Sequence, residues 1–167
     1  MPPAGSPAAA VTALALAKAR AVAARIPPGD AALVLGADTE VVLDGRLLGK
    51  PGDAGAAIRM LRDLRGRWHE VVTGVAVVEA GPGGRERSDA VSTRVRMAVS
   101  TDDEIAAYVA TGEPFDKAGA YAVQGLGARL VAEVDGCYTN VVGLPLTTTR
   151  RLSDLIATEP LRQALGR

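Results

Sequence analysis

The stretch Leu33–Pro51, LVLGADTEVVLDGRLLGKP, contains the clearest structural signal in the chain. It opens on a short apolar run, which is typical of a buried strand. The pair Asp44-Gly45 then stands between two further apolar runs, and this pattern is the strongest short-range signal for a β-hairpin. The stretch therefore predicts a strand and a hairpin that carry a carboxylate, Asp38, and an ammonium, Lys50, to one rim of a sheet.

The hairpin also predicts which residues face one another. Counting outward from a two-residue turn pairs Val41 with Leu48 and Thr39 with Lys50, whose Cβ atoms would lie about 5 Å apart. Strict alternation sends the side chain of Asp38 to the face opposite Thr39. Glycines and a proline break the regularity at this end, so we expect Asp38, Thr39 and Lys50 to share one rim.

Elsewhere the pattern alternates helices with strands. Apolar residues recur at helical spacing after Asp53, and Thr101 with Glu104 forms a capping box ahead of an apolar run. The predicted helices cover 11–25, 53–66, 101–112 and 145–156. The predicted strands cover 32–36, 69–80, 90–99 and 128–134, of which the second and third form a long hairpin. The glycine-rich segment 113–145 is typical of functional loops.

The composition narrows the classes of function. At 167 residues the chain is long enough for one domain with a sizeable core. It carries 19 Lys and Arg against 19 Asp and Glu, so no nucleic-acid partner is expected. No apolar run is long enough to cross a bilayer, so no membrane partner is expected. One cysteine and one histidine rule out an internal disulfide and a zinc site built from these side chains, and we expect a cytoplasmic, reducing location.

The candidate chemistry centres on a carboxylate near lysines. Lysine ammonium groups neutralise phosphate oxygens, and a carboxylate holds a divalent cation or takes a proton from water. Asp38 with Lys50 suits this chemistry, and Lys18 and Lys117 are further candidates. From the residues alone the alternative is favoured, in which Asp38 caps a turn and the lysines are only solvated.

Three other side chains have a functional and a structural interpretation. The amide of Gln124 offers both a donor and an acceptor, which reading a nucleobase edge requires, but it could equally bond its own turn. His69 is interpreted as a structural or exposed histidine rather than a base. Cys137 lacks a second histidine that would activate it, so a thiolate nucleophile is not expected.

Four segments in order resemble one family: VLGADTEVVLDGRLLGKP, HEVVTGVAVV, TGEPFDKAGAYAVQGLGARLV and DGCYTNVVGLPL. They are similar to the Maf family of nucleoside triphosphate pyrophosphatases, from about Leu14 to about Leu155. The resemblance implies an α/β fold like that of inosine triphosphate pyrophosphatases, with a long twisted mixed sheet, flanking helices and a central nucleotide cleft. It also implies that 1–167 form a single domain.

The resemblance implies hydrolysis of a nucleoside triphosphate to the monophosphate and pyrophosphate with a divalent metal, Mg or Mn. Asp38 matches the proton acceptor and is assigned as metal ligand, and Glu40 adds a carboxylate beside it. The matching substrate positions are Lys18, Thr39, Lys50, Lys117 and Gln124. Thr39 and Gln124 resemble the branch that cleaves dTTP and UTP. A homodimer is common in the family.

The start of the chain departs from the family pattern. Members carry a strand and a Ser-Pro-Arg-Arg loop that grips the phosphates, whereas here Ser6-Pro7 is followed by alanines and no such segment precedes Lys18. Arginine–phosphate hydrogen bonds contribute roughly 1.5 to 3 kcal/mol each, so losing two would slow the reaction about 10²- to 10⁴-fold. The alternative is therefore a catalytically impaired nucleotide-binding or cell-division regulatory protein, or a longer native chain.

Overall fold

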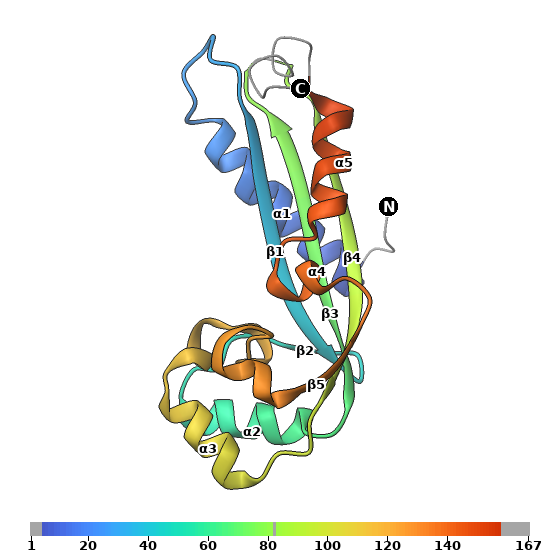
Figure 1. Cartoon of the computed structure of the whole chain (residues 1–167). Coiled ribbons are helices and arrows are strands. Elements are labelled where there is room, and N and C mark those ends of the chain that lie inside the picture. Colours follow the sequence, from blue (N-terminus) through green and yellow to red (C-terminus); the bar gives the residue numbers. More distant parts are fainter. Residues whose placement is uncertain (1–4, 82, 158–167) are drawn as a thin grey trace. The chain divides into compact units, whose positions relative to one another are not determined.

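A computed structural model describes residues 5–81 and 83–157 of the chain (Figure 1). The strands are β1 (Leu33–Leu43), β2 (Arg46–Leu48), β3 (Trp68–Glu79), β4 (Glu86–Met97) and β5 (Val131–Asp135). The α-helices are α1 (Pro7–Ala23), α2 (Ala54–Leu64), α3 (Asp102–Ala110), α4 (Tyr138–Val142) and α5 (Leu146–Ile156). Short 3₁₀ helices are η1 (Glu113–Asp116), η2 (Ala118–Ala120) and η3 (Gly125–Leu130).

The strands form one five-stranded sheet in the order β2-β1-β3-β4-β5. This confirms an α/β fold in which helices flank a sheet. Where a mixed sheet was expected, β1 pairs with β2 and β4 with β5 in antiparallel fashion. A tight hairpin reverses the chain direction between β1 and β2. The antiparallel pair of β4 and β5 is not a hairpin, because α3 and the three 3₁₀ helices lie between these strands in the sequence.

The first hairpin has the predicted turn, and its register is as predicted up to the end of β2. Asp44 and Gly45 both have positive φ, 51° and 76°, as a type I′ turn requires. Val41 pairs with Leu48, but β2 ends there. The expected pairing of Thr39 with Lys50 is therefore wrong.

The hairpin ladder stops because the next residue of the second strand has another partner. The carbonyl of Gly49 accepts a hydrogen bond from the amide of Gly119 at 3.1 Å. This bond takes the chain out of the ladder one residue before Lys50. The lysine is thus directed by a loop contact and not by strand pairing.

The described residues divide into two compact units. The first unit comprises residues up to Asp38, Thr73–Val91 and those from Gly143 onward. The second comprises Thr39–Val72 and Ser92–Val142. Strands β1, β3 and β4 contribute residues to both units, and the interpretation of 1–167 as a single domain stays a prediction.

In the first unit, β3 is buried on both faces, which explains its unbroken apolar sequence. Ala76 and Val78 belong to one cluster, with Ala15 and Ala19 of α1 and Val34 of β1. Alternate residues of β3 belong to another cluster with α5, and its buried members are Val75, Val77, Leu152 and Ile156. The two helices thus pack against alternate side chains of the same strand.

Helix α1 approaches the strands so closely that glycine is required beneath it. A Cβ on Gly36 would overlap the carbonyl oxygen of Ala15, and one on Gly74 would overlap the backbone of Val11. The helix starts earlier than the predicted residue 11, because Ser6 caps it through a 3.2 Å bond from the amide of Ala9. Ser6-Pro7 therefore begins a helix.

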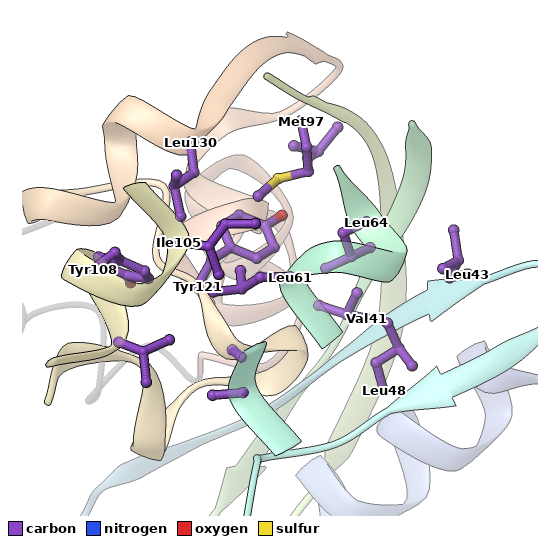
Figure 2. Close-up of a cluster of buried hydrophobic side chains, with 14 of the residues drawn as sticks. Val41, Leu43, Leu48, Leu61, Leu64, Met97, Ile105, Tyr108, Tyr121 and Leu130 are labelled. Atoms are coloured by element: carbon purple, nitrogen blue, oxygen red, sulfur yellow. The ribbon is translucent and has the colours of Figure 1, made fainter. Parts of the chain in front are cut away.

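The second unit has a larger apolar core (Figure 2). Leu61 and Leu64 on one face of α2 pack with Ile105 and Tyr108 of α3, as the amphipathic pattern predicts. The capping box at Thr101 is also confirmed. Further buried members come from the hairpin and from the segment after α3: Val41, Leu43, Leu48, Ala120, Tyr121 and Leu130.

Substituting Gly36 tests the close approach of α1. We expect Gly36→Ala to lower the free energy of unfolding by about 1–3 kcal/mol, because the added methyl forces α1 away from β1. Urea unfolding measures the change. Gly52→Ala is the matched control, since a Cβ at Gly52 meets no atom within 4 Å. Equal losses in the two variants would contradict the steric explanation.

Candidate active site

In the first unit the structure brings together two of the predicted site residues. The Nζ of Lys18 on α1 lies 2.5 Å from Oδ1 of Asp38 and also donates to the carbonyl of Ala37 at 3.2 Å. The Asp38 side chain is only 16% exposed, whereas that of Lys18 is 56% exposed. Asp38 lies within β1 and pairs with a lysine, so the alternative in which it caps a turn is wrong.

The position of Asp38 in β1 determines which neighbours share its face. Side chains alternate along a strand, so Asp38 and Glu40 are on one face of β1 and Thr39 is on the other. The side chains of Thr39 and Glu40 are both half-buried. Two carboxylates two residues apart on one strand are oxygen ligands of the kind that Mg²⁺ and Mn²⁺ prefer.

In the second unit the positive charges of two predicted lysines, Lys117 and Lys50, stabilise the ionised carboxylate of Asp116. The Nζ of Lys117 lies 2.7 Å from Oδ1 of Asp116. This hydrogen bond is the main reason that the pKa of Asp116 lies below its usual value, and the positive charge of Lys50 lowers it further. Lys50 itself forms no hydrogen bond or ion pair within residues 5–81 and 83–157. Its ammonium is exposed beside a carboxylate that it does not bind.

Gly119 explains why these two lysines lie near one another. It has a φ of 68°, and its amide donates to Gly49, the residue before Lys50. A Cβ on Gly119 would lie 3.0 Å from both methyl groups of Val41. The GKP segment, the DKAG segment and β1 therefore meet at a position where only glycine fits without strain.

Gln124 is exposed, and its own backbone is extended directly before η3. Its side-chain amide makes no hydrogen bond within the described part of the chain. The interpretation of Gln124 as a turn amide bonded to its own backbone is therefore wrong. The donor and acceptor of the amide remain available to a ligand.

The described residues contain no group of three or more His, Cys, Asp or Glu side chains that could hold a metal by themselves. Mg²⁺ is usually held by one or two carboxylates together with substrate phosphates. Asp38 and Glu40 could supply such a pair. Among these same residues, no helix is both long and apolar enough to cross a membrane.

Comparison with known proteins identifies the family. Residues 2–155 match the family model described as Maf-like protein. The chain belongs to the Maf family. It is 60% identical over 146 residues to a dTTP/UTP pyrophosphatase of Moorella thermoacetica, which covers 87% of this chain and 73% of that protein.

Two other relatives of this Maf chain carry the same name. A dTTP/UTP pyrophosphatase of Gloeobacter violaceus is 52% identical over 157 residues, 94% of this chain and 78% of that protein. One of Symbiobacterium thermophilum is 53% identical over 146 residues, 87% of this chain and 72% of that protein. These comparisons confirm the resemblance that the sequence motifs indicate.

The single histidine of this Maf chain is structural. His69 is buried, with Nε2 2.7 Å from the hydroxyl of Tyr121, and burial lowers its pKa to about 4. It is therefore neutral at pH 7. Cys137 has its Sγ 3.2 Å from Oγ1 of Thr139, which lowers the thiol pKa, but the chain's one imidazole is bonded elsewhere.

The buried His69 makes stability depend on pH. Between pH 6.5 and pH 4 the unfolded chain binds a proton at this histidine and the folded chain does not, so stability falls as the pH falls. We expect a loss of up to about 3 kcal/mol across this range. Urea unfolding at pH 7, 6 and 5 should show a flatter profile for His69→Gln, and parallel profiles would contradict the prediction.

Proposed function

We propose that this chain is a nucleoside triphosphate pyrophosphatase that hydrolyses dTTP and UTP to the nucleoside monophosphate and pyrophosphate. One observation carries the proposal. The carboxylate of Asp38 is held mostly out of water beside the ammonium of Lys18, within the GADT motif of a chain 60% identical to a dTTP/UTP pyrophosphatase. A general base next to a phosphate-binding cation is what hydrolysis at a phosphorus centre requires.

In the proposed reaction, water attacks the α-phosphorus and the bond from this phosphorus to the bridging oxygen of the β-phosphate breaks. Asp38 accepts the proton of the attacking water, and pyrophosphate leaves. Lys18 is more than half exposed, so its ammonium can turn from Asp38 to a phosphate oxygen. Phosphoryl chemistry of this kind depends mainly on positioning and on neutralising negative charge.

The proposed phosphate contacts of the second unit are Lys50 and Lys117. Lys117 forms a hydrogen bond with the carboxylate of Asp116, and the charge of Lys50 lowers the pKa of the same carboxylate. A phosphate that binds these lysines therefore competes with Asp116. We assign the choice of base to Thr39 and Gln124, because a hydroxyl and an unbonded amide offer donors and acceptors to a pyrimidine edge. Discrimination by such polar groups is stronger than discrimination by apolar contacts.

A divalent cation, Mg²⁺ or Mn²⁺, belongs to the proposed reaction. The carboxylates of Asp38 and Glu40 fit such an ion, because both are oxygen ligands on one face of β1. When bound, the cation would neutralise charge on the phosphates. We also propose a cytoplasmic location from the single cysteine. The homodimer and the absence of a nucleic-acid partner stay predictions.

Release of pyrophosphate from purified protein tests the function. We expect dTTP and UTP to be hydrolysed faster than ATP or GTP, and Asp38→Asn to lower the rate about 10²- to 10⁴-fold, because the general base is lost. Asp30→Asn is the control, since Asp30 is an exposed acidic residue of the same unit. Nucleotide binding without turnover in the unmodified chain would reject hydrolysis and favour the nucleotide-binding alternative.

Removal of metal tests the cofactor. We expect a chelator to abolish pyrophosphate release and added Mg²⁺ or Mn²⁺ to restore it. Glu40→Gln should raise the metal concentration needed for half-maximal rate, because one oxygen ligand loses its charge. Full activity in the presence of excess chelator would contradict the metal requirement.

A further inference from the structure

A hydrogen-bond network in the second unit surrounds the backbone of Gln124. Oε1 of Glu113 accepts a bond from the amide of Gly127 at 2.9 Å, and Oε2 accepts one from the amide of Leu126 at 3.1 Å. The hydroxyl of Tyr108 donates to Oε1 of Glu113 at 3.0 Å. One carboxylate thus accepts bonds from two consecutive amides and from a phenol.

The same phenol also holds the chain on the other side of Gln124. The amide of Ala122 donates to the Tyr108 hydroxyl at 3.3 Å. Since an ionised carboxylate can only accept, the direction of the network is fixed: Ala122 donates to Tyr108, and Tyr108 donates to Glu113. Gln124 therefore lies in a short segment that is tied two residues before it and again two and three residues after it.

The network is attached to the buried core of the second unit through Tyr108. Tyr108 is only 6% exposed and packs in the apolar core of the second unit (Figure 2). The carboxylate of Glu113 also fits tightly against the loop, because a Cβ on Gly125 would lie 2.8 Å from Oε2. The amide bonds and the phenol bond all lower the pKa of Glu113, so the carboxylate is ionised at neutral pH.

We propose that Tyr108 and Glu113 are positioning residues for Gln124, and that they set base selectivity by holding the 122–127 segment in place. The inference rests on the proposed function, in which the amide of Gln124 reads the base. That amide has no bond of its own within the described residues, so its place depends on the backbone that carries it. The hydrogen bonds of Ala122, Leu126 and Gly127 hold this backbone in place on both sides of Gln124.

The two positions call for different substitutions. Tyr108→Phe keeps the buried ring and removes only the hydroxyl. Glu113→Gln keeps the size of the side chain, but its NH₂ group then faces a backbone amide, so one acceptor is lost. Neither residue is assigned a contact with substrate, so both variants should act through Gln124 alone.

The ratio of kcat/KM for UTP over CTP is the readout, since these bases differ in the edge that an amide reads. We expect each variant to lower this ratio about five- to tenfold, mainly through KM for UTP, as for loss of one hydrogen bond. In a Gln124→Ala background the same substitutions should leave the ratio unchanged. Glu133→Gln is the matched control, because Glu133 is an exposed acid of the same unit that pairs with Arg96 at 2.9 Å.

Additive effects on the ratio, undiminished in the Gln124→Ala background, would overturn the inference. Amide hydrogen exchange gives a second readout that needs no turnover: the amides of Ala122, Leu126 and Gly127 should exchange faster in both variants at unchanged global stability. If the unmodified chain releases no pyrophosphate, the proposed function fails by itself. The variants are then compared in UTP and CTP binding, where an unchanged preference would reject the positioning role.

Discussion

The contact between α1 and β1 leaves no room for a side chain at Gly36, and the Lys18–Asp38 pair depends on this contact. The carbonyl of Ala15 occupies the space that a Cβ would need, so the helix backbone lies directly on the strand. Lys18 follows one turn later and reaches the backbone of Ala37 as well as the carboxylate. The small residues of α1 are therefore as important for the site as its charged ones.

A second steric constraint applies to β1 within the other unit. Val41 packs against Gly119, whose amide bonds to Gly49. This contact brings the GKP and DKAG segments together, so that the charges of Lys50 and Lys117 both stabilise the carboxylate of Asp116. In both units a glycine at a strand contact places the lysines. Each ion pair has one well-exposed partner, Lys18 in the first unit and Asp116 in the second, so the pairs add little stability of their own.

The sequence predicts the elements that carry local signals. The turn at Asp44-Gly45 and the capping box at Thr101 involve neighbours in the chain, and both are observed. Helix α4 and the network of Glu113 were not predicted, because they depend on distant contacts. In α4, buried Asn140 donates to the carbonyl of Val71 and to Oγ1 of Thr93, and no local pattern shows such partners. The wrong pairing of Thr39 has the same cause, since a distant amide binds the strand end.

The charge pattern gives a physical reason for a metal in the proposed reaction. The chain has no net charge, and Lys18 and Lys117 are each already paired with an aspartate. A phosphate that binds either lysine displaces a carboxylate, so much of the attraction is offset by the lost ion pair. Lys50 has no carboxylate bond within the described residues, but one cation cannot balance a triphosphate. Once Lys18 has left it, the carboxylate of Asp38 would repel the phosphates. A divalent cation bound by Asp38 and Glu40 would remove this repulsion, because the two carboxylates would then hold a positive charge beside the phosphates.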